Sequence, residues 1–130
     1  MSPRALLTLS VLRDSYAVCR LDPTSPIPDW AQTGEFQSIT RTPAELSIVC
    51  DEKNVPVGIS FEPGWRTLKM EGPLDFILTG IVASVAEPLA DAGVAIFPIA
   101  TYDTDYILVK EAQLELAVRA LADYGHAVRV

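Results

Sequence analysis

Proline is distributed unevenly along this chain of 130 residues, and its distribution decides where helices can form. Seven of the ten prolines lie at or before Pro63. A proline inside a helix removes a main-chain hydrogen bond and clashes with the preceding turn. Residues 22–28 hold three prolines and therefore cannot be helical. We expect the first half of the chain to be built from strands, with a single turn of helix at residues 28–31.

Four strands are expected in this half because its apolar residues partly alternate with polar ones. They cover residues 6–12, 16–21, 35–40 and 46–50. The turn residues Arg13, Asp14 and Ser15 separate the first two strands, so we predict that these strands pair as a hairpin.

The second half shows a different pattern, in which strands and helices alternate. Residues 65–70 alternate bulky apolar with polar side chains, as a half-buried strand does. A helix capped by Thr79 is predicted from Gly80 to Gly93, and Pro88 should break its hydrogen-bond ladder locally. Its predicted apolar stripe consists of Ile81, Val82, Val85, Ala86, Leu89 and Ala90. The remaining elements are strands at residues 94–100 and 106–109, a helix at residues 111–124 and a strand at residues 127–128.

The order strand-helix-strand-strand-helix-strand from Trp65 onward is that of a ferredoxin-like fold. We therefore predict an α+β chain with antiparallel sheets and with helices on one face. The first half resembles a shortened, degenerate copy of the same plan, so a tandem repeat is expected. The predicted domains are residues 1–63 and residues 64–130. Each is too small to build an extensive core without packing on another lobe or another chain.

The chain carries 10 basic and 17 acidic residues, which gives a net charge of −7. Such a charge repels phosphate groups, so we expect neither nucleic acid nor an anionic membrane surface as a partner. No apolar segment reaches the roughly 20 residues of a membrane span, and the N-terminal apolar stretch is too short for a signal peptide. Cys19 and Cys50 lack the spacing of metal ligands and are predicted to be reduced core thiols in a cytoplasmic protein.

Three short motifs in the second half resemble those of a known family. They are Thr79-Gly80-Ile81-Val82, Pro88-Leu89 and Ala100-Thr101-Tyr102-Asp103-Thr104-Asp105. With residues 74–111 as a whole, they resemble small tandem ACT-domain proteins and the ACT units of the CASTOR-type cytosolic arginine sensors. Residues 27–51 are similar to the degenerate first ACT unit of that group, so the resemblance spans nearly the whole chain.

The resemblance implies a regulatory module that binds an amino acid at an interface between ACT units and needs no cofactor. In the arginine sensors, the positions matching residues 79–82, Tyr102 and Asp105 lie on the ligand, and a facing unit contributes main chain. The expected ligand-binding residues are therefore Thr79, Gly80, Ile81, Val82, Ala95, Ile96, Tyr102 and Asp105. We expect the facing unit to belong to a second copy of the chain in a homodimer.

The residues themselves support such a site on physical grounds. A helix N-terminus at Gly80 offers main-chain N–H groups to an amino-acid carboxylate, and Asp105 can pair with an ammonium group. Leu78 stands where the arginine sensors carry a ligand-contacting carboxylate, so arginine would lose one partner in this chain. An amino acid of another kind is compatible with the site.

Other interpretations stay open from the sequence alone. The chain can instead be a structural or protein-interaction module whose pocket is plugged by its own side chains, with Leu78 and Tyr102 among the plugs. Asp103 and Asp105 can belong to a solvated turn rather than to a ligand site. The single histidine, His126, is expected at the surface or at a strand end. Because a nucleophile–base pair is absent from the sequence, we expect no enzymatic activity, no catalytic residues and no metal site.

Overall fold

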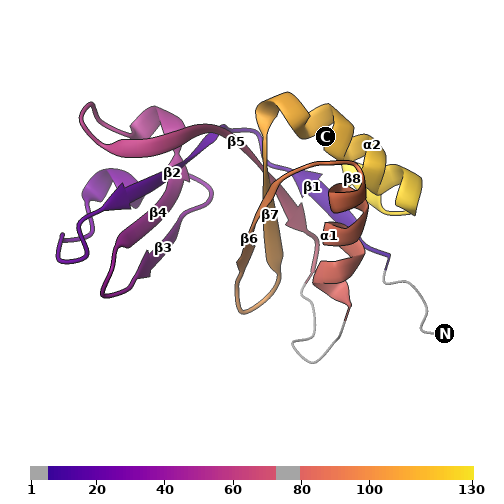
Figure 1. The fold of residues 1–130 in the computed structure, drawn as a ribbon, viewed down its shortest axis with the longest axis horizontal. Coiled ribbons are helices and arrows are strands. Elements are labelled where there is room, and N and C mark those ends of the chain that lie inside the picture. Colours follow the sequence, from indigo (N-terminus) through magenta and orange to yellow (C-terminus); the bar gives the residue numbers. More distant parts are fainter. Residues whose placement is uncertain (1–5, 73–79) are drawn as a thin grey trace. The chain divides into compact units, whose positions relative to one another are not determined.

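The computed structural model describes residues 6–72 and 80–130, and Figure 1 shows its strands and helices as a ribbon. Contacts divide the chain into two compact units. One of them, here called the strand unit, is Asp14–Trp65. The other, the helical unit, joins the residues through Arg13 to Arg66–Val130. This grouping differs from the predicted domains 1–63 and 64–130 because the N-terminal strand pairs within the C-terminal unit.

The helical unit has the strand and helix order that the sequence predicts. The last residues of β5 (Ser60–Met70) belong to it, and the elements that follow are α1 (Ile81–Asp91), β6 (Ile96–Ala100), β7 (Asp105–Lys110), α2 (Leu114–Tyr124) and β8 (Ala127–Arg129). A short 3-10 turn at Glu111–Gln113 leads into α2. The predicted ferredoxin-like α+β fold is thereby confirmed.

The strand β1 (Thr8–Val11) is inserted into the sheet of the helical unit. It pairs antiparallel with β5, where Leu9 is opposite Met70, and parallel with β8, where Leu9 is opposite Val128. Among the described residues the strand order of this unit is therefore β8-β1-β5-β7-β6. The sheet is mixed, not antiparallel throughout as predicted. The predicted hairpin of residues 6–12 and 16–21 is also wrong, because β1 uses its two edges for β5 and β8.

Both helices cover one face of this sheet and enclose the core (Figure 1). Burial of aliphatic side chains at this interface is the main favourable contribution to folding of the unit. On α1, however, Val82 and Ala90 are exposed although the sequence assigned them to the apolar stripe. The helix instead turns its Ser84 and Pro88 side toward the core. The buried core residues are Leu9, Leu68, Met70, Val85, Leu89, Val94, Ile107, Val109, Ala117 and Leu121.

Pro88 and Gly93 determine the hydrogen bonding within α1 and the position of its end. Gly93 has a φ of +79°, and the Val94 N–H donates to the Leu89 carbonyl at 2.9 Å, which closes the helix as predicted. Pro88 lies inside α1 and has no N–H to donate to the Ser84 carbonyl. The local break expected in the hydrogen-bond ladder is therefore present, although the helix continues to Asp91.

His126 lies at a strand end, directly before β8, which is one of the two places predicted for it, but it is buried rather than at the surface. Its side chain is only 4% exposed. The Leu7 N–H donates to Nδ1 of the ring at 3.0 Å, and Nε2 lies 2.7 Å from the Ser84 carbonyl oxygen. The ring therefore connects the segment before β1 to α1.

The strand unit is an antiparallel sheet with two 3-10 turns. Its strands are β2 (Tyr16–Leu21), β3 (Ser38–Arg41) and β4 (Leu46–Asp51), in the order β3-β4-β2, and the first residues of β5 pair with β2. The turns are Asp29–Ala31 and Glu52–Asn54. All of residues 14–65 are described and none is α-helical, which confirms the prediction of a strand-based first half.

The core of the strand unit contains both cysteines, which are free and buried as predicted. Cys19 is opposite Ile48 and Cys50 is opposite Ala17, so the two thiols are diagonal neighbours on β2 and β4 and form a hydrogen bond. This hydrogen bond and burial raise the pKa of the Cys19 thiol, which stays protonated. The buried core residues are Ala17, Cys19, Ala31, Leu46, Ile48 and Cys50.

Candidate functional site

Three of the predicted site residues lie at an open helix N-terminus. Gly80 precedes α1 with a φ of +78°, a left-handed conformation that glycine adopts readily. It supplies no capping side chain, and among the described residues, its chain neighbours aside, none has an atom within 4 Å of the place where a Cβ would stand. Val82 is exposed, whereas Ile81 packs partly against the core. Thr79 and Leu78 fall outside the described residues.

Tyr102 and Asp105 lie at the hairpin between β6 and β7. Asp105 is the first residue of β7 and pairs with Ala100. Tyr102 lies in the connecting turn, and its side chain is 81% exposed. The Tyr102 ring is therefore not buried within the described part of this chain.

Ala95 and Ile96 lie at the far end of β6 from Asp105. Ile96 pairs with Val109 at one end of the hairpin, while Ala100 pairs with Asp105 at the other. Four residues of strand at about 3.3 Å each separate the two ends by about 13 Å. Within one helical unit, Ala95 and Ile96 consequently do not share a site with Asp105. This placement agrees with the expectation that they contact a ligand bound by another unit.

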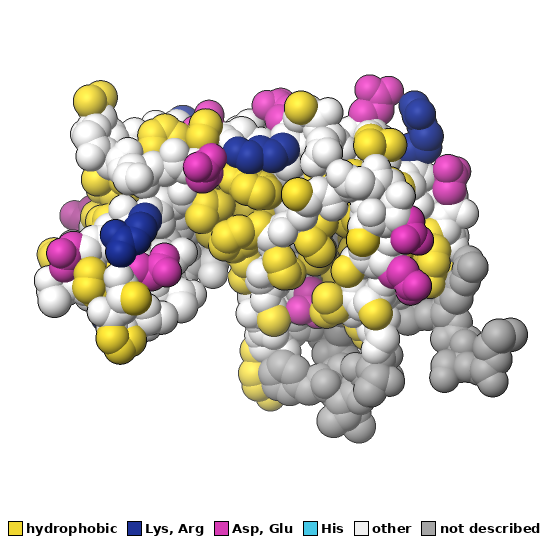
Figure 2. All heavy atoms as spheres, in the orientation of Figure 1, with side chains coloured by type: hydrophobic (Ala, Val, Ile, Leu, Met, Phe, Trp, Pro, Cys, Tyr) yellow, Lys and Arg dark blue, Asp and Glu magenta, His cyan; other side chains and the backbone are white. Residues whose placement is uncertain are grey.

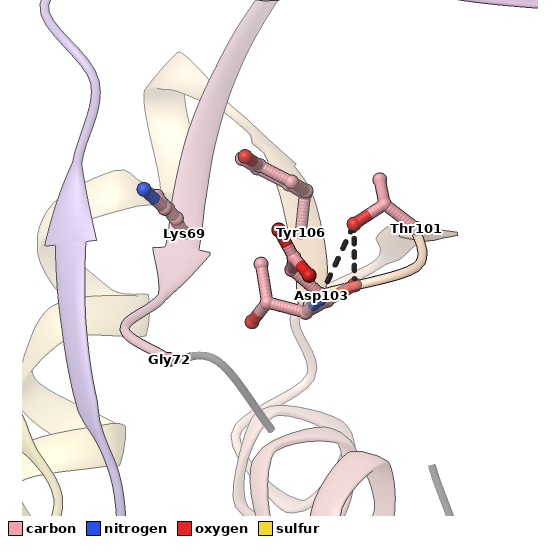
Figure 3. A pocket seen from close by; sticks show the side chains of 6 residues that line it. Lys69, Gly72, Thr101, Asp103 and Tyr106 are labelled. Atoms are coloured by element: carbon pink, nitrogen blue, oxygen red, sulfur yellow. Dashed lines mark hydrogen bonds between the residues drawn. The ribbon is translucent and has the colours of Figure 1, made fainter. Parts of the chain in front are cut away.

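A pocket with a volume of about 270 Å³ lies where β5 ends beside the β6–β7 turn (Figure 3). Lys69 projects from β5, Asp103 from the turn and Tyr106 from β7. The described residues that line it all belong to the helical unit. The lining residues are Lys69, Gly72, Thr101, Asp103, Thr104 and Tyr106.

Hydrogen bonds fix the turn that carries Asp103. The main-chain N–H and the hydroxyl of Thr101 donate to the Thr104 carbonyl oxygen at 2.8 Å and 2.9 Å. In return, the Thr104 N–H donates to the Thr101 hydroxyl at 3.3 Å (Figure 3). The buried Thr104 hydroxyl donates to the Met70 carbonyl at 2.5 Å. The turn is therefore tied to the end of β5, the strand that carries Lys69.

Lys69 and Asp103 bring opposite charges to one pocket without pairing with each other. In the described part of the chain, neither side chain takes part in a hydrogen bond or an ion pair. Lys69 is half-buried and Asp103 is exposed. A pocket with a free ammonium and a free carboxylate can form charge-assisted hydrogen bonds to a ligand that carries both charges.

This pocket differs from the predicted set of site residues. The sequence offers Asp103 as one possible ligand contact, but it gives no such indication for Lys69 or Tyr106. The available signal was that Lys69 occupies a polar position of the amphipathic segment 65–70. That signal places Lys69 on the polar face of a strand, but it does not reveal which turn lies beside the strand.

Other kinds of site find little support in the described residues. No group of three or more His, Cys, Asp or Glu side chains in residues 6–72 and 80–130 is arranged to hold a metal ion. No helix within these ranges is long and apolar enough to cross a membrane. On the face shown in Figure 2, acidic and basic side chains are interspersed and form no continuous basic surface. That face therefore lacks the electrostatic footprint of a nucleic-acid-binding surface.

Comparison with models of protein families gives matches to two segments of the chain. A model described as the ACT domain matches residues 60–123. A second model, described as an N-terminal domain, matches residues 14–58. The first match contains β5, both helices and the β6–β7 hairpin, and thus every lining residue of the pocket.

Individual relatives extend the comparison. The crystal structure of protein Atu0741 from Agrobacterium tumefaciens is 43% identical with a TM-score of 0.90, and the match covers 98% of this chain and 93% of that chain. The cytosolic arginine sensor for mTORC1 subunit 1 of Bos taurus is 32% identical over an alignment of 99 residues, and the match covers 68% of this chain and 30% of that protein. The chain thus spans less than a third of the length of this curated relative.

A more distant structure shows the same fold. The regulatory subunit of aspartate kinase from Thermus thermophilus is 14% identical with a TM-score of 0.66, and the match covers 90% of this chain and 96% of that chain. At this identity the likeness concerns the fold alone.

Proposed function

The chain belongs to the ACT domain family through residues 60–123, and we propose that it is a regulatory module that senses a small amino acid. Its 32% identity to a cytosolic arginine sensor supports an amino acid as the class of ligand. In this proposal the module is cytoplasmic and non-catalytic. The strand unit acts as a degenerate ACT-like lobe that accompanies the ligand-binding helical unit.

The observation that carries this proposal is the open N-terminus of α1. Main-chain N–H groups in the first turn of a helix attract anions, and Gly80 places no side chain over them. An amino-acid carboxylate is an anion of suitable size for this position. We propose that residues 79–82 bind the ligand together with Tyr102 and Asp105, and that the Asp105 carboxylate accepts a hydrogen bond from the ligand ammonium group.

A homodimer completes the proposed site. Ala95 and Ile96 would come from a second copy and face the Gly80 region of the first, which creates two equivalent sites about a two-fold axis. Exposure of Ala95 supports this arrangement, because an exposed small residue leaves its main chain accessible to a partner. Binding of the amino acid would then favour one of two states of the dimer according to its affinity for each.

Calorimetric titration of the whole chain with each of the twenty amino acids tests the function. We expect saturable binding of at least one of them, and thermal stabilisation by about 2.7 kcal/mol at 100 times the dissociation constant. Asp105→Asn should weaken binding about tenfold because it removes a charge-assisted hydrogen bond. Asp123→Asn, at an exposed position of α2, is the matched control. Absence of binding by all twenty amino acids at millimolar concentration would refute the proposal.

The shared site has its own test. Ala95→Arg adds a long charged side chain at an exposed position, so it should weaken the dimer without disturbing the fold. Ile96 is less suitable for this purpose, because it packs partly against the core. Sedimentation at micromolar concentration should show a dimer for the natural chain and a monomer for Ala95→Arg. A natural chain that sediments as a monomer with and without amino acids would contradict the shared site.

A further inference from the structure

We propose that the pocket of Lys69 and Asp103 binds the charged carboxylate and ammonium groups of the ligand. We further propose that it selects α-amino acids with uncharged side chains. This inference rests on the proposed function and names its ligand class. Neither Lys69 nor Asp103 belongs to the positions implied by the family resemblance. The assignment comes from the two charges and from the way in which the fold holds them.

The charges of Lys69 and Asp103 are both available to a ligand. Within the described residues, Lys69 has no carboxylate within ion-pair distance and Asp103 has no cation within that distance. Two opposite charges that line one pocket without pairing can each bind a group of opposite sign on a ligand. A zwitterion supplies both groups. Its carboxylate has two oxygens, so it can accept from the Lys69 ammonium as well as from the N–H groups at the start of α1. Its ammonium has three N–H bonds, so it can donate to the Asp103 carboxylate as well as to Asp105.

The fold fixes the place of Asp103 relative to β5. The Thr104 hydroxyl is buried and bonded to the Met70 carbonyl at 2.5 Å. Because Met70 directly follows Lys69 in β5, this bond fixes the turn of Asp103 beside the strand of Lys69. A site with its charged groups already positioned loses less conformational entropy when the ligand binds.

The pocket limits the size and the charge of the ligand. A volume of about 270 Å³ lies just below the roughly 300–1,000 Å³ of typical ligand pockets, so the ligand must be small. Among the described lining residues, Lys69 and Asp103 are the two that carry charge. A ligand with a charged side chain would bring a third charge, which none of these described residues neutralises. Alanine, serine, threonine and valine satisfy these conditions, whereas arginine and glutamate do not.

The experiment measures dissociation constants by calorimetry for L-alanine, L-serine, L-threonine, L-valine, L-arginine and L-glutamate. We expect the tightest of the four neutral amino acids to bind at least tenfold more tightly than arginine or glutamate. Lys69→Met and Asp103→Asn should each weaken its binding at least tenfold, since each removes a charge-assisted hydrogen bond to the ligand. Lys69→Arg keeps the positive charge and should retain most of the affinity.

Matched controls separate this result from general effects of charge. Lys53→Met and Asp123→Asn change the net charge by the same amounts at exposed positions and should leave the affinity unaltered. Circular dichroism and the melting temperature of each variant verify that it is folded. For the L-alanine arm, propionate and ethylamine, which lack the ammonium and the carboxylate of alanine, should not bind measurably.

Each outcome supports or overturns the inference. If an amino acid binds the natural chain and the variants Lys69→Met and Asp103→Asn with equal affinity, the pocket does not bind the charged groups of that ligand. The proposed function stands in that case. If arginine or glutamate binds most tightly, selection of neutral ligands is wrong. If none of the twenty amino acids binds, the proposed function fails and this inference fails with it.

Discussion

The Nε2 atom of His126 lies 2.7 Å from the main-chain carbonyl oxygen of Ser84. That carbonyl would accept the N–H of residue 88 in an uninterrupted helix, but Pro88 has none. The Leu7 N–H donates to Nδ1 of the same ring at 3.0 Å. Because Nδ1 accepts, Nε2 carries the hydrogen and donates to Ser84. The imidazole thus replaces the donor that Pro88 removes and links α1 to the segment before β1.

Replacement of His126 tests this arrangement. His126→Ala leaves the Leu7 N–H and the Ser84 carbonyl without partners at a buried place, so the free energy of unfolding should fall by about 2–4 kcal/mol. Pro88→Ala restores an N–H that can donate to Ser84. In that background the cost of His126→Ala should be smaller by about 1 kcal/mol. Urea denaturation of the four chains measures the difference, and an equal cost in both backgrounds would show that Pro88 and His126 are not coupled.

Gly34 illustrates how a turn constrains a neighbouring strand. Its φ is +104°, and a Cβ there would stand 2.6 Å from Oδ2 of Asp51. Gly58 has a similar φ of +95°, but nothing lies within 4 Å of its Cβ position. Gly58→Ala should therefore cost only the backbone strain, about 1 kcal/mol. Gly34→Ala should cost about 1 kcal/mol more because of the added clash. Equal losses in urea denaturation would show that Asp51 moves aside freely.

Asp51 makes the stability of the chain depend on pH. The residue is 2% exposed, and burial, followed by the negative charge of Asp14, raises the pKa of its carboxyl group. The unfolded chain therefore releases this proton at lower pH than the folded chain, and stability falls as pH rises from about 3.8. Asp51→Asn should raise the free energy of unfolding at pH 7.

Measuring the effect of Asp51→Asn at low pH provides the control. The gain from Asp51→Asn should shrink and vanish below about pH 3.8, where Asp51 is protonated in both states. Denaturation of both chains between pH 3 and pH 7 gives the two curves. A constant difference between them across this range would mean that ionisation of Asp51 is not the cause.

The buried thiols should be unreactive in the folded chain. Cys19 and Cys50 are 1% and 0% exposed, so burial shields both sulfur atoms from a reagent. For Cys19 the raised pKa also keeps the nucleophilic thiolate scarce. A disulfide-exchange reagent should label them only as fast as the chain unfolds, with both thiols reacting together. Ala112→Cys, at an exposed position, provides a thiol that should react at once. Equally fast labelling of Cys19 or Cys50 would contradict their burial.

The sequence predicted the fold of the helical unit well because its signals are local. Helical and strand periodicity, Gly93 and the break at Pro88 each depend on residues within one element. The insertion of β1 could not be predicted in this way, because the apolar pattern around Leu9 marks a strand but not its partners. The strand-end position of His126 was predicted, but its burial was not, because its hydrogen bonds join residues that are 42 and 119 positions away.

The candidate site was predicted only in part. The turn of residues 101–104 and the open start of α1 follow from residues that are close in sequence. The contribution of Lys69 depends on the Thr104–Met70 hydrogen bond, which spans 34 residues and leaves no mark in the sequence pattern. The resemblance to a family implies a ligand contact at Tyr102, which is exposed in the structure. It implies none at the neighbouring Asp103, which lines the pocket.

The central claim is that the helical unit binds an α-amino acid at the end of its sheet near Lys69 and Gly80. Chemical-shift mapping of the ¹⁵N-labelled chain, titrated with the tightest-binding neutral amino acid, tests it most directly. We predict saturable shifts of the amides of Lys69, Gly72, Gly80, Val82 and residues 101–106, with little change in β3 and β4 of the strand unit. Shifts confined to the strand unit, or no shifts at saturating concentration, would contradict the account.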